Sequence, residues 1–310
     1  MKESDFLQWV FQQDVSGGYD KILVGPGDDM AAVNFNGSQL LVGIDQVLDM
    51  VHFDLKKHGA RAAGRKSLAR NLSDVAAMAA EPAGAVASVA LPGSLTDMEA
   101  RQIYLGMKEL AEEFECPIAG GDISVWPAKM GLLHISVCIF AKPSDGGKVA
   151  PVLRSNAKPG DAICVTGDLG GAWHTSRHLE FTPRIREAAD LARKHQIHSM
   201  IDISDGLATD LYNLCNASKT GAEIFADAVP VHPEAGRCGV SPLSAALADG
   251  EDYELLFTLP DRLSDAVCSD DGMDLKVTKI GVMTDAGKVV ITDRNGKQKP
   301  LEKSGWEYET

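Results

Sequence analysis

Hydrophobic positions follow strand and helix spacing in turn from one end of the chain to the other. Asn36-Gly37 separates two strand-like runs, which predicts a β-hairpin. Ala60–Ala80 is rich in Ala and Leu with helical periodicity, and Thr96 with Glu99 forms a capping box that predicts the start of another helix. Short strand-like runs alternate with these helices, which predicts an α/β protein.

The strand and helix pattern is interrupted once, near the middle of the chain. Lys142–Gly160 contains three Pro, three Gly and few large apolar residues, which is typical of a linker or crossing loop. The alternation of strand, loop and helix then resumes. We therefore predict two α/β domains, over residues 1–143 and 154–310, joined by a linker over residues 144–153.

Composition and charge exclude several classes of function. The 310 residues are 45% hydrophobic and carry a net charge of −14, which argues against nucleic acid or an anionic membrane as a partner. We find no signal peptide and no membrane-length apolar run. The six cysteines lie at least 22 residues apart, so we expect reduced thiols in a cytoplasmic protein rather than disulfides or structural zinc.

Acidic residues stand beside glycine or serine where apolar elements begin or end. Adjacent carboxylates repel one another unless a cation neutralises them, and hard oxygen ligands suit Mg²⁺ bound to substrate phosphates. The seven aspartates are Asp28 and Asp29 in "GPGDD", Asp45 in "GIDQ", Asp74 in "NLSD", Asp122 in "AGGDIS", and Asp202 and Asp205 in "IDISDG". Glu251 follows in "GEDYELLF".

The residues alone leave alternatives open. Each acidic motif could be a turn, and Asp74 is either a cap or a ligand on the helix face that it shares with Asn71. His52 lies between apolar residues, where a packed core histidine is the more common case. The sequence contains no P-loop, no protein-kinase signature and no GxSxG nucleophile motif. Arg154 is the best basic candidate for phosphate, whereas Lys66 and Arg70 are weaker candidates.

Several motifs occur in an order that resembles the thiamine-monophosphate kinase family, within the larger group that includes aminoimidazole ribonucleotide synthetase. They are "GPGDDMAAV", "GIDQVLDMVHF", "GRKSLARNLSDVAAMAAEP", "AGGDIS", "RSNAKPGDAICVTGDLGG", "MIDISDGLATDL", "GEDYELLF" and the C-terminal "SGWEY". The resemblance implies a two-domain fold of this type, in which the mixed N-terminal sheet pairs across a homodimer. It also implies transfer of the γ-phosphoryl group of ATP to thiamine monophosphate with several Mg²⁺ ions and no further catalytic side chain.

The resemblance also assigns roles to residues of this sequence. It implies that Asp28, Asp29, Asp45, Asp74, Asp122, Asp202 and Asp205 bind Mg²⁺, and that Tyr104, Gly121, Asp122, Arg154 and Ser204 contact ATP. It implies that His52, Glu251 and Trp306 contact thiamine monophosphate. An aromatic ring such as that of Trp306 can stack on a flat cationic ring, although a C-terminal aromatic can also simply pin the end of the chain.

The sequence departs from the family pattern at two notable positions. Ile44 precedes Asp45 where hydroxyl residues are usual, and Asp249 stands where a second glycine is usual. Two alternatives to the kinase follow. One is another ATP-using member of the same group, and the other is a degenerate protein that binds nucleotide or thiamine phosphate without turnover.

Overall fold

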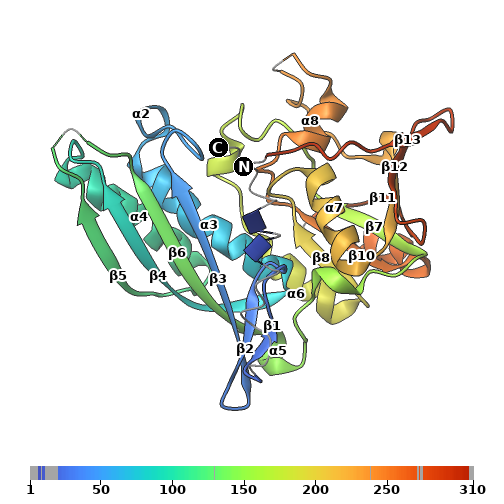
Figure 1. The fold of residues 1–310 in the computed structure, drawn as a ribbon, viewed down its shortest axis with the longest axis horizontal. Coiled ribbons are helices and arrows are strands. Elements are labelled where there is room, and N and C mark those ends of the chain that lie inside the picture. Colours follow the sequence, from blue (N-terminus) through green and yellow to red (C-terminus); the bar gives the residue numbers. More distant parts are fainter. Residues whose placement is uncertain are drawn as a thin grey trace.

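A computed structural model describes residues 6–7, 9–10, 20–128, 130–237, 239–270, 272 and 275–306. The chain forms two mixed β-sheets that lie side by side, each accompanied by helices (Figure 1). This confirms the predicted α/β fold class. Within the described residues, no helix is long and apolar enough to cross a membrane.

The first sheet has six strands in the order β1-β2-β3-β6-β4-β5. Its strands are β1 (Ile22–Val24), β2 (Ala31–Phe35), β3 (Ser38–Leu48), β4 (Ala80–Leu91), β5 (Ile118–Val125) and β6 (His134–Pro143). The β2–β3 hairpin turns at Asn36 and Gly37, whose φ angles of 53° and 85° are those that a two-residue turn of this kind requires. Among the described strands of this sheet, β4 and β5 pair in parallel and the other neighbours are antiparallel. β5 ends the strand order and is an edge strand.

Helices α2 (Leu55–His58), α3 (Ala60–Ala77) and α4 (Asp97–Glu113) belong to the same half of the chain. Thr96 and Glu99 form the predicted capping box at the start of α4. Glycine allows α3 and α4 to approach closely, because a Cβ at Gly64 or Gly106 would lie 1.9 or 2.0 Å from a carbonyl oxygen of the facing helix.

The second sheet has seven strands in the order β13-β12-β9-β11-β7-β10-β8. Its strands are β7 (Asp161–Thr166), β8 (Ser199–Asp202), β9 (Gly221–Phe225), β10 (Leu255–Pro260), β11 (Val277–Thr284), β12 (Val289–Thr292) and β13 (Gln298–Pro300). The connection from the first sheet carries α5 (Ser144–Gly147) and the 3₁₀ turn η1 (Arg154–Asn156). The remaining helices are η2 (Arg177–Leu179), α6 (Ile185–Lys194), α7 (Leu207–Ser218), η3 (Ala226–Ala228), α8 (Pro242–Ala248), η4 (Asp261–Leu263) and α9 (Ser264–Cys268).

Helix α3 joins the two halves of the molecule. It packs against β3, β4 and β6 of the first sheet and against β8 and α6 of the second half. Thirteen of its eighteen residues are buried, as expected for a helix that is surrounded by protein. Ser73 near its C-terminal end donates a hydrogen bond to Asp202 at the end of β8, at 2.6 Å. The helix therefore carries its polar residues into the region between the two sheets.

Candidate active site

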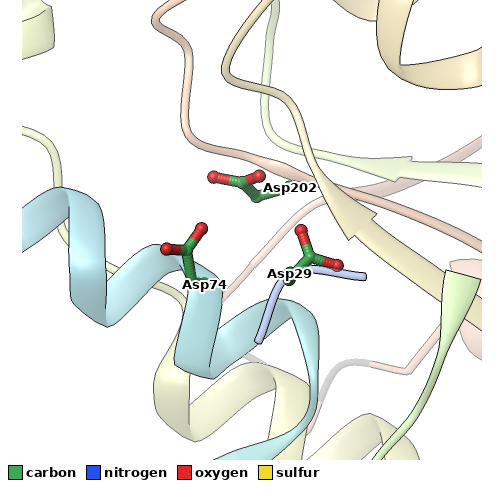
Figure 2. Close-up of side chains that lie close together, drawn as sticks. All are labelled: Asp29, Asp74 and Asp202. Carbon is green, nitrogen blue, oxygen red and sulfur yellow. The ribbon is translucent and has the colours of Figure 1, made fainter. Parts of the chain in front are cut away.

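Three predicted metal ligands meet where the two halves of the chain face each other. Asp29 lies in the loop between β1 and β2, Asp74 in the last turn of α3, and Asp202 at the end of β8. Figure 2 shows their three carboxylates turned toward one another, and one oxygen from each lies within 4.8 Å of the others. Segments that are far apart in the sequence thus build one acidic cluster.

The cluster forms part of the wall of a cavity of about 590 Å³. Most of the residues predicted for the site line this cavity: Asp29, Asp45, His52, Asp74, Arg154, Asp202, Ser204, Asp205, Glu251 and Trp306. Asp28, Tyr104, Gly121 and Asp122 do not line it. The structure therefore gathers the acids together with the predicted thiamine monophosphate contacts, and separates them from part of the predicted ATP site.

Burial and mutual repulsion both act on the acids of the cluster. Burial, and then the charges of Asp45, Asp202 and Asp29, raise the pKa of Asp74 well above its usual range. Burial and the charge of Asp29 raise the pKa of Asp202 to about 7. The free energy of the folded protein therefore falls when a proton or a cation neutralises the cluster.

The donor set fits a hard divalent cation. Three carboxylates within 4.8 Å of one another offer only oxygen ligands. Burial and then neighbouring carboxylates raise the pKa values of Asp74 and Asp202. Among the described residues, one ion pair involves these three acids, and it joins Arg154 to Asp29. Asp29, Asp74 and Asp202 are therefore the residues that would hold Mg²⁺.

Asp28 and Asp29 have different environments although they are adjacent. The Asp29 carboxylate accepts two hydrogen bonds from the Arg154 guanidinium group, at 2.6 and 3.1 Å. The Asp28 carboxylate accepts hydrogen bonds from the backbone N–H groups of Asp29 and Arg154, at 3.1 and 3.2 Å. Burial, and then repulsion by Asp29, raise the pKa of Asp28 to about 6. Asp28 thus holds the Arg154 backbone beside the cluster.

Asp45 enters the cavity from β3 and is held by residues of α3. Arg70 pairs with its carboxylate at 3.2 Å, and Asn71 accepts a hydrogen bond from its backbone N–H at 3.2 Å. Burial raises the pKa of Asp45, although the Arg70 charge opposes that effect. The neighbouring Ile44 also lines the cavity, and its side chain is 70% exposed.

The predicted substrate contacts His52 and Glu251 are connected by Lys66, a residue that sequence reasoning ranked as a weak phosphate ligand. Lys66 is fully buried; its ammonium group forms an ion pair with Glu251 and donates to the His52 carbonyl oxygen at 2.7 Å. Burial lowers the pKa of Lys66 to about 8, although the Glu251 charge opposes that effect. No signal in the sequence identified this contact across 185 positions.

His52 itself is neutral in this environment. Burial, and then the charges of Arg70 and Lys66, lower its pKa to about 3. Its Nδ1 accepts the backbone N–H of Leu48 at 3.1 Å, which leaves Nε2 as the protonated nitrogen. His52 is therefore a neutral hydrogen-bond donor rather than a cation.

Tyr104, Gly121 and Asp122 line a separate groove of about 390 Å³ between α4 and the edge strand β5. The rest of its lining is mostly apolar and includes Val89, Ile103, Met107 and Ile123. A flat apolar ring system fits such a groove better than a polyphosphate does. The predicted ATP residues are thus divided between this groove and the cavity, where Arg154 and Ser204 lie.

Asp249 has a structural partner. Its carboxylate accepts a hydrogen bond from the backbone N–H of Gly171 at 3.0 Å, beside Asp252, which accepts from Gly170 and pairs with Arg177. Neither acid lines the cavity. The Asp249 carboxylate therefore joins the segment after α8 to the loop after β7.

Comparisons with known proteins agree with this architecture. Residues 27–142 match the sequence model of the AIR synthase related protein N-terminal domain, and residues 158–294 match that of the C-terminal domain. The fold and the site thus define the class of AIR synthase related proteins.

Similarity to individual proteins narrows the class. The thiamine-monophosphate kinase of Rhodopirellula baltica is 36% identical over 300 residues, which is 93% of this chain and 89% of that protein. That of Pyrococcus abyssi is 33% identical over 298 residues, 91% of this chain and 90% of that protein. The solved structure of AaThiL complexed with AMPPCP and TMP is 28% identical, covers 99% of this chain and 97% of that chain, and has a TM-score of 0.82. The chain belongs to the thiamine-monophosphate kinase family.

Proposed function

We propose that this protein transfers the γ-phosphoryl group of ATP to the phosphate of thiamine monophosphate, which gives thiamine diphosphate and ADP. The observation that carries the proposal is the cavity in which Asp29, Asp74 and Asp202 meet beside His52, Glu251 and Trp306. Relatives named thiamine-monophosphate kinase over most of this chain, and the AaThiL complex with AMPPCP and TMP, support it.

The chemistry follows from the charges in the cavity. Phosphoryl transfer between two polyanions depends mainly on positioning and on neutralising charge, because the protein forms no covalent bond. When bound, Mg²⁺ at Asp29, Asp74 and Asp202, with Asp45 and Asp205 nearby, would neutralise phosphate charge. Arg154 would bind ATP phosphates, and Ser204 lines the same cavity.

The thiamine end of the substrate would occupy the other part of the cavity. The Glu251 carboxylate, fixed by Lys66, provides negative charge for a cationic thiazolium ring. Neutral His52 provides a hydrogen-bond donor, and half-exposed Trp306 provides an aromatic face for stacking. The backbone N–H of Trp306 donates to the backbone carbonyl oxygen of Asp205 at 2.9 Å, and Trp306 lines the cavity.

A homodimer would complete the ATP site. The face of the first sheet opposite its buried side chains carries the row Gln46, Ser136, Ser88 and Asp122, paired across four strands. Gln46, Ser88 and Asp122 are exposed, and the edge strand β5 presents Ile123 at 68% exposure. We propose that a second copy packs on this face and brings its own groove of Tyr104, Gly121 and Asp122 to Ile44, which lies on the same face and at the cavity.

We also propose a cytoplasmic location. The five cysteines that the structure describes are free thiols, which suits a reducing compartment. We also propose that the two domains span residues 1–143 and 154–310, with residues 144–153 as the linker.

A product assay tests the function. Purified protein is incubated with ATP, Mg²⁺ and thiamine monophosphate, and thiamine diphosphate and ADP are separated by chromatography. Equal amounts of both products would support the kinase. ADP without thiamine diphosphate would indicate another acceptor within the same class, and no turnover with ligand-induced thermal stabilisation would indicate a binding protein.

A further inference from the structure

Tyr253 lies in the wall of the cavity and differs from an ordinary buried tyrosine in two respects. Its side chain is only 2% exposed, yet its hydroxyl oxygen is buried without a hydrogen-bond partner among the described residues. Its backbone has a φ of 53°, in the left-handed region that bulky residues rarely adopt. Buried tyrosine hydroxyl groups usually have a partner, so this donor requires an explanation.

The fold fixes the position of this hydroxyl group. The Tyr253 ring stacks on the Phe181 ring with a centroid distance of 4.0 Å and an interplanar angle of 12°. The backbone N–H of Tyr253 donates to the backbone carbonyl oxygen of Ile203 at 2.8 Å. The backbone N–H of Glu251 donates to the backbone carbonyl oxygen of Ser204 at 2.7 Å. Strained backbone that is held this firmly is characteristic of functional sites. Tyr253 therefore lies in the cavity wall in a backbone conformation that has an energetic cost.

The surroundings of the hydroxyl group indicate which ligand atom it would meet. Tyr253 lines the same cavity as the charged residues Arg70, Glu251, Asp45 and Asp202. Asp45 and Asp202 belong to the part of the cavity predicted to hold Mg²⁺ and phosphate, whereas Glu251 belongs to the part predicted to hold the thiazolium ring. The group of thiamine monophosphate that lies between its ring and the metal is its phosphate.

We propose that the Tyr253 hydroxyl group donates a hydrogen bond to a phosphate oxygen of bound thiamine monophosphate and so orients the acceptor phosphate toward ATP. This inference rests on the proposed function. It assigns to the strained loop after α8 a direct contact with substrate. It also explains why the donor has no partner within the described chain, because its acceptor belongs to the ligand.

The test compares Tyr253→Phe with Tyr212→Phe. Phenylalanine at position 253 keeps the ring on Phe181 and removes only the unpartnered hydroxyl group. The control hydroxyl at Tyr212 donates to the Leu301 oxygen at 2.7 Å and does not line the cavity. Because the Tyr212 hydroxyl, unlike that of Tyr253, has a partner among the described residues, Tyr212→Phe should lower Tm and leave substrate binding unchanged. Tyr253→Phe should leave Tm unchanged and weaken binding of thiamine monophosphate about 10-fold or more.

Calorimetric titration with Mg²⁺ present separates the possible outcomes. Binding of thiamine, which has no phosphate, should be equal in wild type and Tyr253→Phe. Equal affinity for thiamine monophosphate in the two proteins, or a loss of thiamine binding as well, would overturn the inference. Should the wild type form no thiamine diphosphate, the proposed function fails. Titration with inorganic phosphate then still decides: weaker binding in the variant supports the phosphate contact, and equal binding overturns it.

Discussion

The guanidinium group of Arg154 and the carboxylate of Asp29 form a two-point ion pair at the edge of the acidic cluster. In this position Arg154 neutralises one of the acids that would hold Mg²⁺ and lies close to any phosphate bound there. Its planar fork matches carboxylate and phosphate oxygens equally well. The pair therefore connects the metal ligands with the predicted ATP site.

The first prediction concerns this arginine. Arg154→Gln should raise the KM for ATP about 10- to 100-fold, because hydrogen bonds to charged groups contribute about 1.5–3 kcal/mol, and should change the KM for thiamine monophosphate much less. Arg177→Gln is the control, because Arg177 makes a comparable 2.7 Å pair with buried Asp252 outside the cavity. The control should lower Tm without changing either KM. A change of both KM values by the same factor in Arg154→Gln would contradict its assignment to ATP.

The second prediction separates stability from activity at Asp74. Asp74→Asn should abolish turnover, because one ligand of the acidic cluster is lost. The same variant should raise the Tm of the protein in EDTA by about 2–4 °C for each ~1 kcal/mol of unfavourable charge removed. Burial, and then the charges of Asp45, Asp202 and Asp29, raise the pKa of this acid, so its charged form is unfavourable. Calorimetry and the product assay measure both effects.

The matched control for Asp74 is Asp285→Asn, in an exposed turn after β11. It should change neither activity nor Tm. A stable Asp74→Asn variant with full activity would remove Asp74 from the metal site.

The third prediction concerns pH. Folding raises the pKa of Asp202 to about 7 and that of Asp28 to about 6, whereas aspartates of an unfolded chain titrate near ~3.9. The native state therefore holds more protons between these values, so the stability of the metal-free protein falls as pH rises from about 4 to about 7. Stabilisation by Mg²⁺ should grow over the same range.

Thermal scans between pH 5 and pH 8, with EDTA or with saturating Mg²⁺, measure this dependence. Titration of Mg²⁺ at pH 6 in buffers of different ionisation enthalpy should detect proton release. A metal-free Tm that rises with pH over this range would contradict the repulsion inferred for the cluster.

The fourth prediction concerns the homodimer. Ser88→Arg places a long charged side chain on the exposed sheet face, and it should convert a dimer to a monomer in light scattering and reduce turnover. Ala286→Arg, at an exposed position between β11 and β12 of the second sheet, is the control and should remain dimeric. If the wild type is a monomer with full activity, the proposed completion of the ATP site is wrong.

Local sequence patterns predicted most of the elements. The capping box at Thr96 and the turn at Asn36-Gly37 form as expected, because the residues that determine these features are close together in the sequence. Helix α8 and strands β12 and β13 were not predicted. These elements are short and have weak periodicity, so their tertiary neighbours determine their structure.

The site could be predicted only in part. The acids were singled out because they lie near glycine or serine beside apolar runs, yet Asp45 and Asp122 lie within strands β3 and β5 and not at the end of an element. Asp28 was grouped with the acids that share cations, yet its carboxylate binds backbone N–H groups outside the cavity. The contact of Lys66 with Glu251 and the left-handed backbone of Tyr253 depend on packing between distant segments. No local pattern in the sequence indicates which distant segments pack together, so neither feature could be predicted.

The last prediction tests the buried ion pair at the thiamine end of the cavity. Lys66→Met removes a fully buried cation and leaves the Glu251 carboxylate without its partner. We expect a loss of about 3–5 kcal/mol in the free energy of unfolding, together with weaker binding of thiamine monophosphate, because Glu251 would lose its fixed position. Lys108→Met is the control, since Lys108 makes the same kind of pair with Glu112 on the exposed surface of α4. The control should change neither Tm nor KM.

The double variant Lys66→Met with Glu251→Gln distinguishes the effect of the ion pair on stability from its effect on substrate binding. Removing both charges should restore much of the stability lost in Lys66→Met, because no unpaired buried charge remains. It should not restore binding of thiamine monophosphate, because the Glu251 charge that would face the thiazolium ring is absent. Urea denaturation and substrate titration on the wild type, Lys66→Met, Glu251→Gln and the double variant complete the cycle. Recovery of substrate binding in the double variant would show that the pair acts only in folding, and that another residue of the cavity recognises the thiamine ring.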